Sequence, residues 1–398
     1  MSSQKIRTAL GLLQDDSDNE SAWLELQDAI TSPDIGMSDD ELVDLLEAAR
    51  KEHEARREWQ AVANLLEYEI SRIQGSPQEA SRQAELAHVF EDELLDDARA
   101  TAAYKRLLAL RPDDPTATEA LERAADIREA WKDLTQSKID DAKSEDDPSI
   151  RSSMLSWAAE TQFRFGQTEV SIEDLIGLLQ QAIELDPHNR RACLLLERFY
   201  RENERWEEAC TILEVLALES SALEERLAAW LRLARVVVQK LNNERRGVAA
   251  YERALDLSPG CPEAMNFLAD YFGRSEQYDH LVALYEDQLK SGGFESGQDL
   301  GIWLQIAMVQ WRMRERADLA EPYFDKVRRV EPSHPGMLGY YREWCEQQGD
   351  SDKLLTILTD AQRALPEGDQ KNELSAEIAK LAENKEDVHK AIEQYKAL

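Results

Sequence analysis

Apolar residues recur along the whole chain at intervals of three and four. Val248, Tyr251 and Leu255 form one such stripe, and the segment 281–285 carries another. This spacing places apolar side chains on one face of an α-helix, whereas a half-buried strand would alternate at every second residue. β-Branched residues are sparse and hairpin dipeptides such as Asn-Gly are absent. We therefore expect helix, turn and helix throughout, with no sheet.

A longer pattern repeats about every 73 residues. One proline closes a helical segment in each repeat, at intervals of 75, 72 and 73 residues: Pro112, Pro187, Pro259 and Pro332. Alanine recurs in phase at Ala87, Ala159, Ala234, Ala307 and Ala379. Aromatic residues follow the same period in two series: Trp157, Trp230 and Trp303, and Trp59, Trp131, Trp206 and Tyr278. Since these markers keep one phase, the chain is predicted to be an array of repeats with a half-period near 36 residues.

Helix-breaking residues mark the longer loops of this array. They are Gly75-Ser76-Pro77, Asp146-Asp147-Pro148, Ser220-Ser221, Gly292-Gly293 and Pro366-Glu367-Gly368. The prediction is one domain over residues 1–398, with units at 1–76, 77–148, 149–221, 222–293 and 294–367 and a partial unit at 368–398.

These residues resemble the tetratricopeptide repeat family. Its first helix is matched by Trp230, Leu233, Ala234 and Val237, and its second by Gly247, Tyr251, Ala254 and Pro259. Shorter matches are Ala100, Tyr104 and Pro112, then Ala182 and Pro187, then Ala320, Phe324 and Pro332. Alternate pairs depart from the family, because the helices after Trp59, Trp131, Trp206 and Tyr278 lack the closing proline and are expected to run several residues longer. Those halves look like degenerate or half-a-tetratricopeptide repeats.

The resemblance implies an all-α fold, a right-handed superhelical α-solenoid of about eleven stacked antiparallel helix pairs. One helix pair cannot bury its own apolar face, so each pair packs on its neighbours. In the family, the first helices of the pairs line a concave surface that holds peptides or proteins.

Charge excludes several classes of partner. The chain has 80 acidic and 47 basic residues, a net charge of −33. It would repel nucleic acid and anionic membranes, so neither is predicted as a partner. Residues 1–150 carry a net charge of −19, which makes them the expected site for a basic partner. The alternative is that the acidity only maintains solubility or adapts the protein to a saline habitat.

The sequence carries no recognisable catalytic, cofactor or metal motif. Phosphate-binding glycine loops and Cys-x-x-Cys pairs are absent, and the acidic run at residues 15–20 lacks the glycine and the last glutamate of a calcium loop. The chain has four cysteines, Cys193, Cys210, Cys261 and Cys345; three of them sit within apolar helical patterns and are interpreted as small core residues. The chain is predicted to be non-enzymatic and without a cofactor. With no apolar run long enough for a membrane span and no leader pattern, a cytoplasmic location is expected.

Carrying the family's groove positions over by the proline register gives the candidate protein-binding residues. They are Arg191, Leu194, Arg198, Arg201, Arg235, Glu263, Asn266 and Asp270. Three of the arginines form a basic stripe that suits an acidic peptide; the alternative is a solvated face paired within the chain. The family's chaperone-tail site also needs lysines that are missing here, so that ligand is not predicted.

The leading hypothesis is a scaffold or adaptor that binds partner segments along a superhelical groove. The first alternative is the regulatory or substrate-presenting arm of an enzyme whose catalytic domain lies outside this chain. RNA processing is a third alternative, which the charge disfavours. The last repeat is incomplete at Leu398, so we expect either further chain beyond it or an end that docks on a partner or a second copy.

Overall fold

The computed structural model describes residues 2–15, 17, 19–32, 35–166, 169–291, 298–366, 368–384 and 388–397. Gly292-Gly293 and two residues of the acidic run, Asp16 and Asp18, lie outside these ranges. Within the described residues every regular element is a helix. The helices fall into two compact units, unit 1 (Met1–Gly247) and unit 2 (Val248–Leu398).

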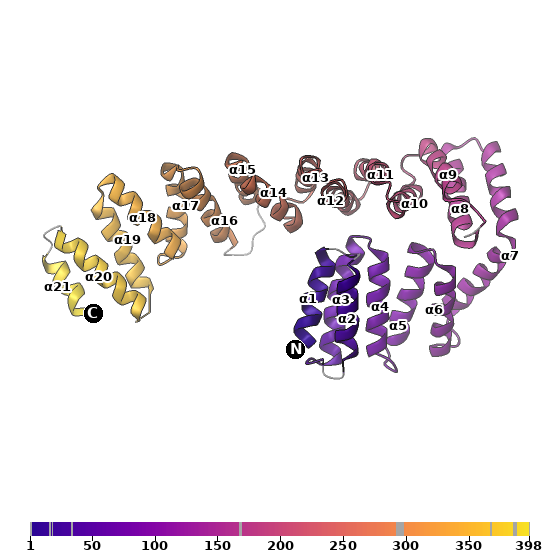
Figure 1. The fold of residues 1–398 in the computed structure, drawn as a ribbon, viewed down its shortest axis with the longest axis horizontal. Coiled ribbons are helices and arrows are strands. Elements are labelled where there is room, and N and C mark those ends of the chain that lie inside the picture. Colours follow the sequence, from indigo (N-terminus) through magenta and orange to yellow (C-terminus); the bar gives the residue numbers. More distant parts are fainter. Residues whose placement is uncertain are drawn as a thin grey trace. The chain divides into compact units, whose positions relative to one another are not determined.

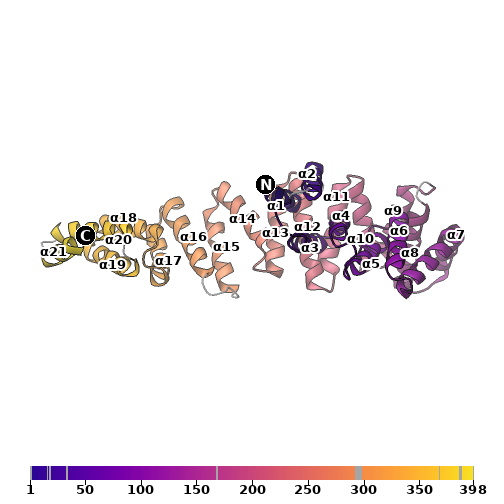
Figure 2. The same cartoon turned by 90° about the horizontal axis from the view of Figure 1, so that it is seen from below.

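Unit 1 is built from two rows of helices joined by one long helix (Figures 1 and 2). The first row holds α1 (Ser2–Asp15), α2 (Glu20–Thr31), α3 (Asp39–Ala55), α4 (Trp59–Arg72), α5 (Glu79–His88), the short π-helix η1 (Val89–Glu93) and α6 (Asp97–Leu110). The joining helix is α7 (Pro115–Ser144). The second row holds α8 (Pro148–Gly166), α9 (Ile172–Leu185), α10 (Arg190–Glu202), α11 (Trp206–Glu219) and α12 (Leu223–Gln239). In the second row each helix packs on the next one in the chain; in the first row α1 contacts both α2 and α3, and α3 to α6 pack in chain order.

Unit 2 continues the same construction. Helix α13 (Glu244–Leu257) contains the boundary between the units. It is followed by α14 (Pro262–Arg274), α15 (Tyr278–Ser291), α16 (Gln298–Met308), the π-helix η2 (Val309–Met313), α17 (Ala317–Val330), α18 (Pro335–Gln348), α19 (Ser351–Ala364), α20 (Asp369–Asn384) and α21 (Val388–Ala397). The predicted fold class, an all-α solenoid of stacked antiparallel helix pairs, is thus confirmed within each unit. The division into units of about 73 residues stays a prediction.

The repeat markers occupy the structural positions that their chemistry requires. The four phased prolines each lie two residues past a helix end, after α6, α9, α13 and α17, because proline disfavours helical geometry in the residue before it. The five phased alanines, Ala87, Ala159, Ala234, Ala307 and Ala379, are all fully buried. All four cysteines are buried as well. At each phased alanine the side chain is a single methyl group, which allows the two packed helices to approach closely.

Turns inside several helix pairs share one backbone feature, a non-glycine residue with positive φ. Arg57, Glu204 and Glu276 have φ values of 59°, 57° and 55°, and each lies two residues before the helix that starts at Trp59, Trp206 or Tyr278. A non-glycine residue in this left-handed region costs about 1–2 kcal/mol. The turns therefore persist only where packing of the following helix offsets that strain.

The sequence prediction is wrong at Trp131, because the repeat pattern predicted that a separate helix follows this residue. Residues 115–144 instead form the single 30-residue helix α7. Ala130, which has the highest helix propensity of any residue type, follows the position equivalent to the strained residue. Continuing the helix avoids the left-handed residue, and most of the residues between Arg128 and Ser144 remain exposed. The prediction that the helices without a closing proline run longer is also wrong elsewhere, since α4, α11 and α15 have 14 residues, as do α6, α9, α13 and α17.

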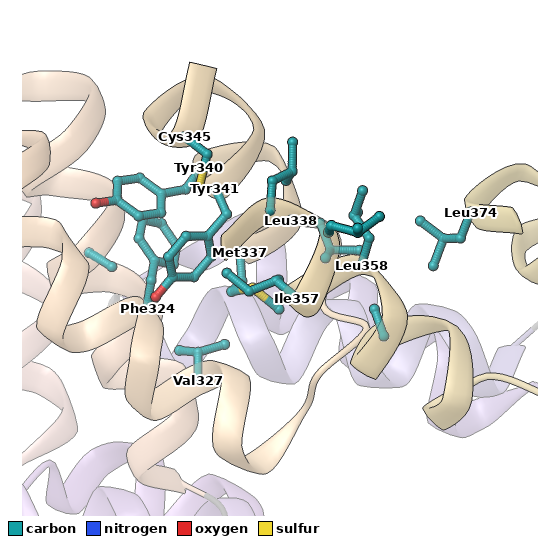
Figure 3. Packing of buried hydrophobic residues seen from close by; sticks show 14 of the residues in the cluster. Phe324, Val327, Met337, Leu338, Tyr340, Tyr341, Cys345, Ile357, Leu358 and Leu374 are labelled. Carbon is teal, nitrogen blue, oxygen red and sulfur yellow. The ribbon is translucent and has the colours of Figure 1, made fainter. Parts of the chain in front are cut away.

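Unit 2 has an aromatic core. Figure 3 shows Phe324, Tyr340 and Tyr341 gathered between α17 and α18. The rings of Phe324 and Tyr340 stack with centroids 4.4 Å apart, and Trp311 meets both edge-on at 5.8 Å and 5.5 Å. Stacked and edge-to-face geometries each add stabilisation beyond area burial. These contacts join η2, α17 and α18 into one cluster.

Candidate interaction surface

The two rows of unit 1 are linked by a buried carboxylate. Glu91 in η1 is 4% exposed and accepts hydrogen bonds from the Tyr104 hydroxyl at 2.6 Å and from Arg123 at 2.9 Å. Arg164 of α8 lies 3.3 Å from the same carboxylate and 3.5 Å from Asp97. Burial alone would raise the pKa of Glu91, but these hydrogen bonds and the positive charge of Arg164 lower it.

Two of the predicted site residues cap the end of a helix in the opposite row. Arg191 donates to the Asp92 carbonyl oxygen at 2.6 Å, and Arg198 donates to the carbonyl oxygens of Glu93 and Leu94 at 2.9 Å and 3.0 Å. The last carbonyls of a helix lack intrahelical partners and carry partial negative charge, so guanidinium groups are suited to them. Arg191 also pairs with Glu160 of α8 at 2.8 Å. For these two arginines, the structure shows the intramolecular pairing that was the alternative reading of the basic stripe.

The remaining predicted residues are divided between the units. Arg201 lies 3.8 Å from Glu197, and Arg235 lies 3.6 Å from Glu58 of the first row. Leu194 is half-buried in α10. Glu263, Asn266 and Asp270 lie on α14 in unit 2, where Asn266 and Asp270 are exposed and Glu263 accepts a hydrogen bond from Tyr251 at 3.3 Å. Their joint role in binding a partner stays a prediction.

One cavity between the rows combines apolar walls with a few polar groups, and we call it the apolar cavity. Its volume is about 430 Å³. The lining residues are Gln60, Leu94, Leu95, Asp96 and Arg99 from the first row and Gln162, Phe163, Val170, Ile172, Leu175 and Arg198 from the second row and its loops. Concave sites of this size and composition are typical of ligand pockets.

A second cavity between the rows has six cations among its described lining residues, and we call it the basic cavity. Its volume is about 110 Å³. The charged lining residues are Arg56, Arg57, Arg201, Arg232, Arg235, Lys240, Glu58 and Glu197. Sequence reasoning identified Arg201 and Arg235 but missed Arg56, Arg57, Arg232 and Lys240. Arg232 was within reach, since it lies three residues before Arg235 and so shares its helix face. Arg56 and Arg57 matched no repeat position and no motif, so the sequence pattern did not indicate them.

Unit 2 has a groove of its own. It spans α13, α14 and α15, with a volume of about 850 Å³. Leu255, Leu268, Phe272 and Leu284 contribute apolar walls, with charged residues such as Arg253 around them. It is a second concave surface of a size suited to side chains of a partner.

The described part of the chain offers little for other chemistries. Among these residues, no three histidine, cysteine or acidic side chains gather as metal ligands would. Burial raises the pKa of the Cys193 and Cys210 thiols to about 11, which keeps them protonated and poorly nucleophilic at neutral pH. No helix in the described ranges combines the length and apolar character needed to cross a membrane.

Comparisons with known proteins give likeness in structure alone. No protein-family model and no curated protein matches the sequence. Yeast Tom70 is similar at 11% identity over 96% of each chain, with a TM-score of 0.28. A tetratricopeptide repeat protein from Parabacteroides merdae is 15% identical over 76% of this chain and 98% of its own, with a TM-score of 0.26. YrrB, described as a TPR protein with an unusual peptide-binding site, is 17% identical over 52% of this chain and 97% of its own, with a TM-score of 0.27.

Because these TM-scores are low, the fold assignment rests on the chain's own sequence and structure. The phased prolines and the fully buried phased alanines recur about every 73 residues, in a series of helices that pack on their neighbours. A repeat fold of this kind does not specify a function. The chain is therefore an all-α repeat protein that resembles the tetratricopeptide repeat family in fold.

Proposed function

We propose that this chain is a non-enzymatic scaffold that binds a segment of a partner protein between the two rows of unit 1. The observation that carries the proposal is the apolar cavity, which residues of both rows line. Repeat arrays commonly use their concave side to hold extended partner segments. Apolar walls supply affinity there, and a few polar groups fix the orientation of the bound segment.

The arginines of α10 have a structural part in this proposal. Arg191 and Arg198 hold η1 against the second row through main-chain carbonyls, so they fix the distance between the rows. Reversing their charge would disturb this contact as well as any ligand contact. Such variants therefore do not report on binding alone.

A better test places a charge in the cavity wall without touching the contacts between the rows. Ile172, at the start of α9, is half-buried and lines the cavity, so Ile172→Glu should abolish capture of a partner that inserts apolar side chains. Ile150→Glu is the matched control, because Ile150 is 46% exposed and is not part of the lining. A photo-crosslinking side chain at position 172 should form adducts with the same partner. Capture that is indifferent to Ile172→Glu, with no adduct at position 172, would refute the proposal.

The more detailed predictions from the sequence remain proposals of the same kind. A basic partner on residues 1–150, a cytoplasmic location, a second copy or further domain at the C-terminal end, and an attached enzyme all stay predictions. The arm of a larger enzyme would use this surface in the same way.

A further inference from the structure

The basic cavity concentrates positive charge inside a strongly acidic protein. Among the residues that the structure describes, six cations and two carboxylates line it, while the whole chain has a net charge of −33. The cations come from both rows of unit 1. Arg56 and Arg57 lie at the turn between α3 and α4, and Arg201, Arg232, Arg235 and Lys240 belong to α10, α12 and the end of α12.

Several of these side chains are held in place by the chain itself. Arg56 donates to the carbonyl of Gln14 at the end of α1. Arg57 pairs with Glu93 at 2.9 Å, and its guanidinium lies 5.3 Å from the centre of the Trp59 ring. Lys240 lies over the ring of Trp206 at 5.4 Å. Donors that are already oriented lose less freedom when a ligand binds.

Glu197 and Glu58 neutralise part of this charge. Glu197 is 2% exposed and pairs with Arg232, while Glu58 bonds His53 at 2.5 Å and lies 3.6 Å from Arg235. Burial lowers the pKa of Arg57; the carboxylates of Glu93 and Glu225 oppose this shift, and the positive charges of Arg190 and Arg232 add to it. Cations repelling one another in this way favour the entry of an anion.

The size of the cavity limits what can enter. A volume measured this way must reach roughly 10–15 Å³ to hold one water, so about 110 Å³ accommodates one acidic side chain and its hydration. Arginine forks match the two oxygens of a carboxylate. A carboxylate also carries less charge than a phosphate, so the acidic surface of the chain repels it less on approach.

We propose that the basic cavity binds a carboxylate side chain from an acidic peptide segment of the partner. This inference rests on the proposed scaffold function and names the chemistry of the bound segment. It assigns the ligand-facing role to Arg201, Arg232, Arg235 and Lys240, while Arg191 and Arg198 serve the contact between the rows. Two of the four, Arg201 and Arg235, belong to the site predicted from the sequence.

The test uses the full chain and a fluorescein-labelled twelve-residue peptide that carries four glutamates separated by glycine and serine. Affinity is measured by fluorescence anisotropy. The double variant Arg201→Gln, Lys240→Gln removes two rim cations and leaves the Arg232–Glu197 and Arg57–Glu93 pairs intact. We expect it to weaken binding by about tenfold or more, since charge-assisted contacts dominate such sites. Lys240→Gln alone, at an exposed residue, should weaken binding by a smaller factor and covers the case in which the double variant fails to fold.

The matched control is Lys105→Gln, Arg106→Gln, which removes the same charge from two exposed residues of α6 that do not line the cavity. The control should bind the peptide within about twofold of the unchanged chain, because screened charges far from a site contribute little. Equal weakening by the control would show non-specific attraction and overturn the proposal. No binding by the unchanged chain, or equal binding of a glutamine version of the peptide, would overturn it too.

Two further outcomes distinguish the carboxylate proposal from a phosphate ligand and from binding in the apolar cavity. Binding of a phosphoserine peptide, or competition by inorganic phosphate, without binding of the glutamate peptide would overturn the carboxylate assignment. Ile150→Glu should leave glutamate-peptide affinity unchanged, because Ile150 is exposed and lines neither cavity. If partner capture ignores Ile172→Glu while the peptide still depends on Arg201 and Lys240, the proposed use of the apolar cavity fails and the basic cavity stands.

Discussion

Glu91 offers a direct test of how the two rows of unit 1 are held together. Glu91→Gln keeps the shape of the side chain and an oxygen that can accept from Tyr104, but it removes the charge that faces Arg164. The Arg123 pair contributes little, because the Arg123 side chain is 61% exposed. The expected loss therefore comes mainly from Arg164, whose side chain is 13% exposed.

The size of that loss follows from what Arg164 retains. Breaking a buried ion pair by removing one partner costs about 3–5 kcal/mol when the remaining charge has no other partner. Arg164 still has Asp97 at 3.5 Å, so we expect about 2 kcal/mol for Glu91→Gln. A change of this size corresponds to roughly 30-fold faster exchange for amides that exchange by opening of this region.

Hydrogen exchange read by mass spectrometry measures this effect locally. Peptides from η1 and α8 should exchange faster in Glu91→Gln, and peptides from α18 and α19 in unit 2 should be unchanged, which provides the internal control. A double-mutant cycle with Arg164→Met should give a coupling energy well above the roughly 0.5 kcal/mol expected for independent sites. A coupling energy near zero would refute the view that this ion pair links the rows.

The pH dependence of the same contact has a definite sign. Interactions in the folded state lower the pKa of Glu91 below its ordinary value of 4.5. The carboxylate therefore stabilises the folded state fully above that value, and this contribution is lost as the pH falls through the lowered pKa. Glu91→Gln, which cannot titrate, should remove this share of the acid sensitivity. An acid profile identical in the two proteins would contradict the assignment.

Two further predictions concern the aromatic residues of both units. Phe324→Ala should destabilise unit 2 by about 3–5 kcal/mol, since Phe324 is fully buried against Tyr340, and exchange in α17 and α18 should rise while exchange in α3 and α4 stays constant; an effect shared equally by both units would contradict it. Burial and a hydrogen bond to Glu286 raise the pKa of Tyr323 to about 12, and burial raises the pKa of Tyr104 and Tyr341 as well. Because folding raises the pKa of these tyrosines, they stabilise the folded state below the unfolded pKa of about 10, and this stabilisation is lost as the pH rises above that value toward the folded pKa. Phenolate absorbance should therefore show these tyrosines ionising together with the loss of helical circular dichroism. Ionisation of all eleven tyrosines near pH 10 with the helices intact would contradict this.

The repeat could be predicted from the sequence because its determinants are local and periodic. A proline that ends a helix acts on the residue before it, and a buried alanine is needed at each close crossing. Ala234 and Ala307, 73 residues apart, report the same packing in two different units. The four prolines place the ends of α6, α9, α13 and α17.

The continuous helix α7 and the contact between the rows could not be placed in this way. Near Trp131, the choice between a turn and a continuing helix depends on whether packing offsets one left-handed residue, and packing is not visible in the sequence. The contacts that link the rows join residues far apart in the chain: Arg164 and Glu91 are separated by 73 residues, and Arg198 and Glu93 by 105. One of the acceptors is a main-chain carbonyl, for which no residue type gives a signal.

The structure divides the predicted basic residues of unit 1 into two groups. Arg191 and Arg198 reach helix-terminal carbonyls and are used to hold the rows, whereas Arg201 and Arg235, from the same predicted set, line a cavity with four further cations. Repulsion from a net charge of −33 acts over the Debye length, about 8 Å at physiological ionic strength, while the attraction of the cavity acts only at contact. An acidic segment must therefore pay an approach penalty that salt reduces, before it reaches partly buried cations that salt screens much less. The basic cavity therefore selects for a narrow segment with one well-placed carboxylate, and the acidic exterior selects against folded partners of high negative charge.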